Sequence, residues 1–512
     1  MRTPGNYFRA TFGLDLRSLA AMRVGLAGVV LTDLAIRASD FHAMYSSAGL
    51  APVEFVRDLQ RIPVWSLHLL SGSDAWQIFL FGLATLFAVA MLVGYQTRMA
   101  AVASWVLLTS VQMRMPLVLN AGDTLLRVAL FWSMFLPLGA IWSMDAFRRD
   151  KASFRRDKPS GSLGSSPLRW DVNPFVSVAS FALIVQLAIV YWFAGWAKWN
   201  DAWLHEDAIG NVFKFGLYGL PLGAALSDYP ALTRFFSRAT VWFELLGPLL
   251  LFIPWRVNML RMLAFIGFVL LHIGIAATMT VGLFSYAAIA MWLGVLPSEF
   301  WERFAPFRMH EAVDESASQL RSLPRRMGRV LAATLCVTSL AIVIYWNVAN
   351  EISNSPVNSY DRGIRVAAHL AGLRQGWGVF ARPPRQDCWF VYQARLQNGE
   401  LVDLLSSGEV IANKPPLASR QFSNHRWRKL HYRIRAESCA PYRQALADYM
   451  IREWNARHAA DEQVVRLDVY YFSQAFDLAG TPGDHARMTL AQVVLSDEGG
   501  NFAEALRGND EF

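Results

Sequence analysis

Long runs of apolar residues alternate with short polar loops over the first two thirds of the chain. A run of about 20 apolar residues can cross the roughly 30 Å hydrocarbon layer of a membrane as a helix. Nine such runs are predicted, at residues 19–35, 76–95, 99–113, 117–142, 176–196, 240–252, 260–279, 283–296 and 330–346. The first run follows Arg9 and Arg17 without a small-residue cleavage site, so no cleavable signal peptide is expected. The pattern predicts an α-helical polytopic membrane bundle with about nine transmembrane helices.

The basic residues of the loops all fall on one side of this arrangement. Seven lie within residues 148–169 and five within residues 303–326, and Arg98, Arg256 and Arg261 mark the remaining turns on the same side. Loops rich in Lys and Arg face the cytoplasm. The N-terminus is therefore expected in the cytoplasm, and nine crossings place everything after about residue 350 outside.

The chain beyond residue 350 loses the long apolar runs. Asn398-Gly399, a tight-turn dipeptide, separates two strand-like runs and predicts a hairpin. Residues 441–455 have helical periodicity, and residues 464–472 alternate like a strand. An extracytoplasmic α+β domain is expected at residues 350–512, after a transmembrane domain at 1–300 and a basic loop with the last transmembrane helix at 301–349.

Two of the three cysteines lie in this outer domain. Cys388 and Cys439 would be exposed to an oxidising compartment, which predicts a disulfide between them. The alternative is two unrelated thiols. Cys336 falls inside the last apolar run and is expected to be a packing residue.

Composition supports a membrane protein and excludes several other classes. Hydrophobic residues make up 54% of the chain and charged residues 17%, against about 25% charged in an average soluble protein. The net charge of +8 is attributed to cytoplasmic loops rather than to nucleic-acid binding. The sequence has no Walker loop, dinucleotide fingerprint, HExxH or CxxC pair, so neither a phosphate-driven pump nor a metal site is expected.

Several polar side chains lie within or beside the apolar runs, near their outer ends. Such a residue is costly in lipid unless it is paired or faces a cavity, so each one is a functional candidate. Seven are predicted to converge on one polar pocket on the outer side of the membrane, namely Asn120, Asp123, Arg127, Lys198, Glu244, His272 and Tyr286.

These residues also have purely structural interpretations. Asp123 and Arg127 are four residues apart and can neutralise each other on one helix face. Lys198 can extend to water from a belt of tryptophans, and Glu244 can pair with Lys198. His272 can donate a hydrogen bond to a carbonyl group of a neighbouring helix.

Three segments resemble the vitamin K-dependent gamma-carboxylase. Residues 191–203 (YWFAGWAKWNDAW) are similar to the segment that carries its catalytic lysine. Residues 272–286 (HIGIAATMTVGLFSY) resemble a carboxylase stretch that begins with His and closes with Gly-x-Phe-Ser-Tyr, and residues 142–145 (WSMD) are similar to the stretch after its fourth span.

Three further segments resemble the bacterial relatives called HTTM (horizontally transferred transmembrane) domain proteins. They are residues 65–73 (WSLHLLSGS), 92–98 (LVGYQTR) and 120–127 (NAGDTLLR). Together the resemblance covers roughly residues 10–300 and implies a bacterial inner-membrane protein.

The resemblance implies a quinol-dependent enzyme at the outer face. The eukaryotic carboxylases use reduced vitamin K, oxygen and carbon dioxide to convert protein Glu to gamma-carboxyglutamate while epoxidising the quinone. By resemblance, Lys198 would be the base that deprotonates a hydroquinone (menaquinol or vitamin K hydroquinone), with His272 and Glu244 in support and Asp123 tuning the pocket. The carboxylase has a functional histidine where this chain reads Gly122 or Asp123, which favours quinol chemistry without Glu carboxylation.

Two alternatives of other classes remain open. The first is a non-catalytic membrane module that binds a lipid, a quinone, or a protein partner at the outer domain. The second is a transporter, which the absence of paired inverted segments disfavours.

Overall fold

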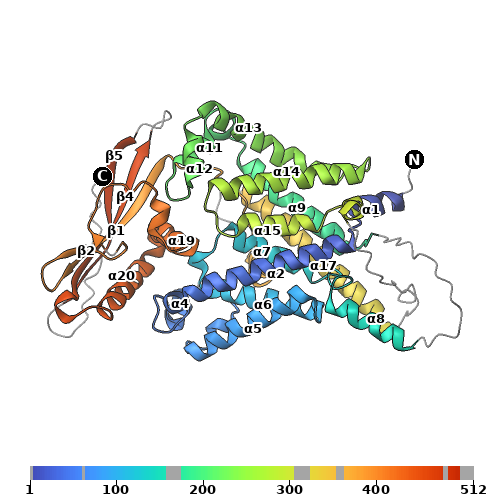
Figure 1. Ribbon diagram of the computed structural model, residues 1–512, viewed down its shortest axis with the longest axis horizontal. Coiled ribbons are helices and arrows are strands. Elements are labelled where there is room, and N and C mark those ends of the chain that lie inside the picture. The colour runs from blue at the N-terminus through green and yellow to red at the C-terminus, as the bar shows by residue number, and fades with distance from the viewer. Residues whose placement is uncertain are drawn as a thin grey trace.

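Helices fill the first two thirds of the chain, and a sheet follows near its end (Figure 1). The structure, a computed structural model, describes residues 4–59, 64–156, 174–304, 323–352, 362–406, 408–476 and 482–495. The sheet lies at one end of the molecule, and the helices α1 (Pro4–Phe12) and α8 (Met144–Arg156) lie at the opposite end (Figure 1). The predicted basic loop at 303–326 falls largely outside the described residues, as do residues 157–169 of the other basic loop.

The helical part consists of long helices joined by short ones. Up to residue 304 the helices are α1 (Pro4–Phe12), α2 (Leu16–Ser39), α3 (Phe41–Met44), α4 (Val53–Leu59), α5 (Asp74–Val93), α6 (Thr97–Arg114), α7 (Ala121–Ser133), α8 (Met144–Arg156), α9 (Val178–Ala197), α10 (Asp201–Leu204), α11 (Ala208–Lys214), α12 (Pro221–Ser227), α13 (Pro230–Leu246), α14 (Val257–Thr278), α15 (Phe284–Leu293) and α16 (Ser298–Phe304). They are followed by α17 (Leu323–Ile352), α18 (Arg362–Leu370), α19 (His425–Ile434) and α20 (Ala440–Asn455).

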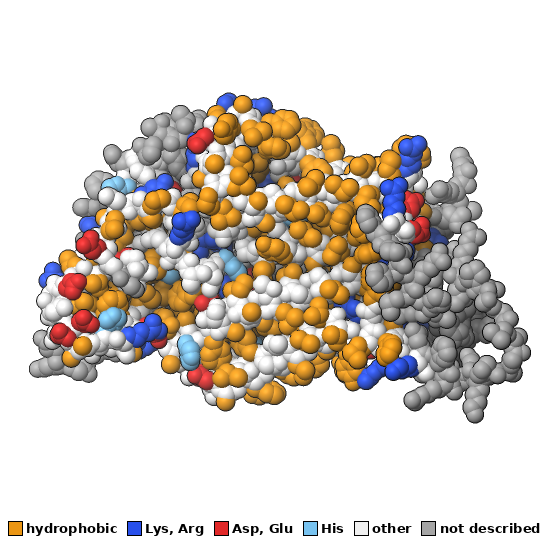
Figure 2. Space-filling view, viewed as in Figure 1, with side chains coloured by type: hydrophobic (Ala, Val, Ile, Leu, Met, Phe, Trp, Pro, Cys, Tyr) orange, Lys and Arg blue, Asp and Glu red, His pale blue; other side chains and the backbone are white. Residues whose placement is uncertain are grey.

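Five helices in the described part of the chain are long and apolar enough to cross a membrane. They are α2, α5, α9, α14 and residues Met327–Ala349 of α17. Hydrophobic side chains cover the middle of the molecule, and charged side chains gather toward its two ends (Figure 2). These features fit a multi-pass membrane protein.

The other four predicted spans coincide with shorter or more polar helices. The run at 117–142 is the clearest case, because its helix α7 has 13 residues and ends at Ser133. α15 has ten residues, and α13 passes into a 3₁₀ turn at Gly247. Five of the nine predicted runs therefore coincide with described helices that are long and apolar enough to cross a membrane.

Close helix packing in the bundle depends on small residues. α2 lies against α5, α7 and α15, and α9 lies against α13 and α17. A Cβ atom at Gly25 of α2 would lie 3.0 Å from the Cβ atom of Ala290 in α15. Small side chains at such contacts let two helix backbones approach closely, as in membrane bundles generally.

The C-terminal part forms the expected α+β domain. Its antiparallel sheet has the order β3-β2-β1-β4-β5, and the strands are β1 (Gln386–Leu396), β2 (Leu401–Asp403), β3 (Gly408–Glu409), β4 (Val464–Phe476) and β5 (Pro482–Val494). The hairpin at Asn398-Gly399 is confirmed, since β1 pairs with β2 and Gly399 has a positive φ of 86°. The predicted helix is α20, which packs against β4 and β5.

The segment at residues 372–380, which joins α18 to β1, packs against the helices rather than the sheet. The Gln375 carbonyl accepts a hydrogen bond from Trp346 of α17 at 2.7 Å. The Gln375 side chain exchanges hydrogen bonds with Gln186 of α9, and Trp377 is 2% exposed. This segment, which follows α18, is therefore held against α9 and α17.

The disulfide predicted between Cys388 and Cys439 is wrong, because both thiols are free. Cys388 lies inside β1, where it is buried and its thiol contacts Tyr471 of the neighbouring strand. Burial raises the pKa of the Cys388 thiol to about 12. Cys439 precedes α20 and is half-buried. The two side chains thus occupy different surroundings.

This difference predicts selective labelling of the native protein. A maleimide should modify Cys439 alone, because the buried Cys388 and Cys336 are inaccessible and a thiol reacts as its thiolate. Intact mass spectrometry should show one label per chain before unfolding and three after unfolding without a reductant. A single label after unfolding would mean that two cysteines are joined.

Candidate functional site

Two neighbouring cavities lie where the helices meet the C-terminal domain. The smaller has a volume of about 550 Å³ and the larger about 1410 Å³. We call the smaller one, which contains Lys198, the apolar cavity, and the larger one, which contains Lys429, the basic cavity. They share four wall residues, namely Val281, Phe284, Val379 and Phe380.

The walls of the apolar cavity are mainly aliphatic and aromatic side chains from α9, α11, α13, α14 and the 372–380 segment. Representative wall residues are Val190, Val212, Phe236, Leu271 and Trp377. Cavities of this size and composition are typical of sites for small apolar ligands, which a few polar groups orient.

A buried ion pair forms one polar group of this cavity. Lys198 caps the C-terminus of α9, and its Nζ lies 2.8 Å and 3.0 Å from the two carboxylate oxygens of Glu244 in α13. Both residues are 6% exposed. Of the two structural interpretations of Lys198, the ion pair with Glu244 is therefore observed. Lys198 does not extend into water.

Gly195 allows α9 and α13 to approach closely enough for this pair. A Cβ atom at Gly195 would lie 3.1 Å from the Cβ atom of Glu244 and 3.0 Å from Cγ of Leu245. A larger side chain would push α13 away from α9. The small residue one turn before Lys198 thus helps to position its partner.

His272 and Tyr191 form the second polar group. His272 Nε2 lies 2.8 Å from the Tyr191 hydroxyl, which accepts a hydrogen bond from Trp292 Nε1 at 2.7 Å. Because the indole N–H can only donate, the buried tyrosine keeps its own proton to donate to His272 Nε2. The imidazole proton then lies on Nδ1, which is buried without a partner among the described residues. The alternative considered from the sequence, in which His272 donates to a backbone carbonyl, is not seen among the described residues.

The basic cavity receives two of the predicted residues. Asn120 caps α7 by accepting hydrogen bonds from the backbone N–H groups of Gly122 at 2.7 Å and Asp123 at 3.3 Å. Arg127 of α7 donates from Nε to the Gly372 carbonyl at 2.7 Å. Both Asn120 and Arg127 line the wall of this cavity.

Asp123 belongs to a buried network of four charged residues. Its Oδ1 lies 2.8 Å from Arg37 Nη2 and 3.1 Å from Arg426 Nη2. Asp33 completes the network through Arg37 Nε at 2.8 Å and through Arg426. The direct pairing of Asp123 with Arg127 suggested by their spacing is not formed, because Asp123 faces α2 and α19 instead.

The seven predicted residues thus do not form one pocket. Lys198, Glu244 and His272 line the apolar cavity, whereas Asn120 and Arg127 line the neighbouring basic cavity. Asp123 lies in the ion network, and Tyr286 is 55% exposed and is absent from both walls.

Sequence reasoning missed two contributors to these cavities. Tyr191 lies in the resembling segment 191–203 but carries no charge to mark it. The helix α19 has four Lys or Arg residues in ten, which was a detectable signal in the outer domain. Its contact with the bundle was not predictable, because no local pattern relates it to α2 or α7.

Comparisons with known proteins bear on the part of the chain that forms the apolar cavity. Comparisons with curated proteins and with solved structures give no match. The expected similarity to HTTM proteins is confirmed over the segment that holds Lys198, Glu244 and His272: residues 168–299 match the family model of the HTTM domain.

Proposed function

We propose that this membrane protein binds a reduced quinone in the apolar cavity and that the Lys198–Glu244 pair accepts a proton from the quinol hydroxyl. The observation that carries the proposal is the buried ion pair, with Nζ and Oε 2.8 Å apart, in the wall of a mainly apolar cavity. A prenylated quinol suits this site, because its chain is apolar and its ring carries an ionisable hydroxyl. Menaquinol and vitamin K hydroquinone are the two candidates.

The pair can act as a base because its proton is shared between two groups. Glu244 can take a proton from Lys198 across their hydrogen bond, which leaves a neutral amine to accept the quinol proton. The resulting ammonium lies beside the new quinolate and stabilises its negative charge in an apolar surrounding. His272 offers an unpaired N–H on Nδ1 to a ligand oxygen.

The reaction that follows from the resemblance is quinol epoxidation. A quinol and one O₂ give a quinone epoxide and one water: one oxygen atom enters the epoxide and the other leaves as water, so the quinol supplies all four electrons that reduce O₂. We propose this reaction without Glu carboxylation, at the outer face of a bacterial inner membrane.

The proposal includes a membrane arrangement with nine crossings and an extracytoplasmic C-terminal domain. In support, α1 and the basic helix α8 lie at the end of the molecule opposite the sheet (Figure 1). Positively charged segments beside spans favour the cytoplasmic side.

Lys198→Ala should abolish epoxide formation by the purified protein in nanodiscs. We expect a rate at least about 100-fold below the wild type, the range for loss of a general base. Menaquinol or vitamin K hydroquinone would be supplied with oxygen, and the epoxide measured by chromatography. Lys151→Ala, an exposed lysine on α8, is the control and should keep full activity. Equal turnover by Lys198→Ala and wild type would contradict the role of Lys198.

A non-catalytic binding module is the second candidate. It is favoured by the fact that Glu244 already neutralises Lys198, since a paired ammonium needs no reaction to explain its presence. In that case menaquinone should bind the folded wild type without turnover of either quinol. Binding would be measured with radiolabelled menaquinone in the same nanodiscs.

A further inference from the structure

The basic cavity carries a concentration of positive charge without matching negative charge. Six cationic side chains line it, namely Arg127, Arg374, Arg382, Arg428, Lys429 and Arg433. None of them forms an ion pair with an acidic residue in the part of the chain that the structure describes. The one acidic residue of the wall, Glu437, is paired with Arg443 at 3.2 Å.

Neutral groups hold these cations in place. Arg433 of α19 donates to the carbonyl oxygens of Pro116 at 2.6 Å and Leu119 at 3.1 Å. Arg428 donates to Thr280 Oγ1 at 3.0 Å. A carbonyl or hydroxyl oxygen orients a guanidinium but leaves its charge uncompensated, so the cavity keeps a positive potential.

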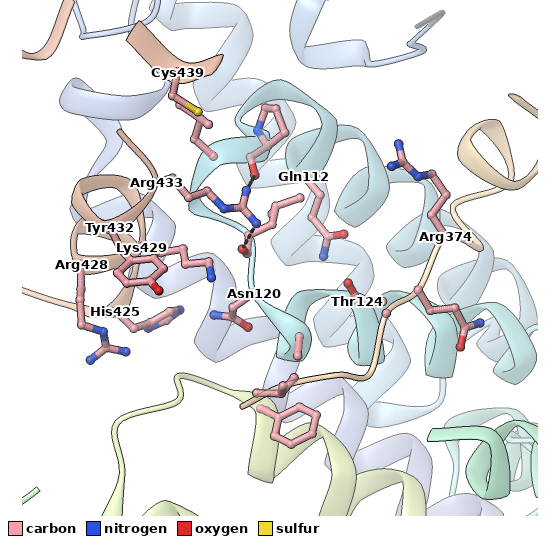
Figure 3. Close-up of a pocket in the computed structure, with 18 of the residues that line it drawn as sticks. Gln112, Asn120, Thr124, Arg374, His425, Arg428, Lys429, Tyr432, Arg433 and Cys439 are labelled. Atoms are coloured by element: carbon pink, nitrogen blue, oxygen red, sulfur yellow. Dashed lines mark hydrogen bonds between the residues drawn. The ribbon is translucent and has the colours of Figure 1, made fainter. Parts of the chain in front are cut away.

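Lys429 is the cation of α19 best placed to meet a ligand. Its side chain extends from α19 toward Asn120 on the opposite wall (Figure 3). Its ammonium has no hydrogen-bond acceptor among the residues described. Burial first, and the nearby guanidinium groups of Arg433 and Arg428 second, lower the pKa of Lys429 to about 8. Burial also lowers the pKa of His425 to about 4, so this imidazole is neutral at pH 7.

We propose that the basic cavity binds the phosphate group of an anionic ligand. Guanidinium and ammonium groups recognise phosphate oxygens through charge-assisted hydrogen bonds. A phosphomonoester or a pyrophosphate carries more than one negative charge at pH 7 and can offset more than one of the neighbouring cations, whereas a phosphodiester headgroup offsets one. At about 1410 Å³ the cavity accommodates a group much larger than a single ion.

The wall shared with the apolar cavity suits a phosphate that is attached to an apolar group. Phe284 and Phe380 belong to both walls, so an apolar part could lie against them while the phosphate meets Lys429. The phosphate could belong to a membrane lipid headgroup or to a soluble compound, and both sources use the same contacts. This site does not depend on the quinol chemistry proposed for Lys198.

The test compares the full chain with charge-matched variants in a neutral detergent. Pyrophosphate binding would be measured by titration calorimetry, and binding of phosphatidylglycerol against phosphatidylcholine by native mass spectrometry of delipidated protein. The cavity variant is Lys429→Gln with Arg433→Gln. The control is Arg395→Gln with Arg487→Gln, two exposed arginines of the sheet that carry the same total charge.

Wild type and control should bind a phosphate probe. The cavity variant should bind it about tenfold more weakly or worse, because it loses two cations that make charge-assisted hydrogen bonds to phosphate oxygens. Binding of pyrophosphate would indicate a soluble ligand, and selective binding of phosphatidylglycerol a lipid headgroup. Lys429→Gln alone should weaken binding in the same direction while leaving the contacts of Arg433 intact. The proposal is overturned if neither probe binds the wild type, or if control and cavity variant lose equal affinity.

Discussion

Glu244→Leu should lower the free energy of unfolding by about 3 to 5 kcal/mol, the usual cost of leaving one member of a buried ion pair without its partner. The ammonium of Lys198 would retain only a contact with the Ala194 carbonyl at 3.4 Å and the face of Trp203, whose ring centre is 5.4 Å away. Neither replaces a carboxylate in an apolar cavity.

A second substitution should reverse this loss. Glu244→Leu combined with Lys198→Met replaces both charges by apolar groups of similar size, and such replacements are often neutral or stabilising. Thermal unfolding in one detergent would compare wild type, both single variants and the double variant. Single variants as stable as the wild type would mean that water or lipid compensates the remaining charge.

The double variant also separates stability from chemistry. If it folds as well as the wild type but forms no epoxide, the ion pair is kept for proton transfer rather than for folding. If wild type and double variant both bind menaquinone and neither turns it over, the pair belongs to a binding module.

The sequence was sufficient for features that depend on local periodicity. The long apolar helices α2, α5, α9 and α14 follow from continuous apolar runs, because in lipid a helix satisfies its own backbone hydrogen bonds. The hairpin at Asn398-Gly399 follows from the conformational freedom of glycine, since Gly399 has a positive φ.

The composition of the pocket required information that the sequence lacks. Counting residues gives the depth of a side chain along a helix but not the side toward which it points. Lys198, Glu244 and His272 share both a depth and a side, so they line one cavity. Tyr286, near the same depth, points outward, and Asp123 turns toward α2.

Arg426 links α19 to the helical bundle through buried ion pairs. It is 1% exposed and pairs with Asp33 of α2 and Asp123 of α7, while Arg37 contacts the same two carboxylates. Two arginines and two aspartates balance within the network. Arg426 therefore attaches α19 to the bundle and also balances the charge of the two bundle carboxylates.

Arg426→Met should leave two buried carboxylates with one cation and should destabilise the native protein by about 3 to 5 kcal/mol. The native structure should open first at the contact of α19 with α2 and α7. Hydrogen exchange should therefore show lost protection in α19 before any change in α9 or α14.

The charge balance of the network supplies the decisive comparison. Adding Asp33→Asn to Arg426→Met leaves Arg37 with Asp123 as a balanced pair, so this double variant should recover stability and α19 protection that Arg426→Met loses. Arg395→Met, an exposed arginine on β1, is the control and should behave as the wild type. If Asp33→Asn restores nothing, Arg426 stabilises α19 through packing rather than through charge.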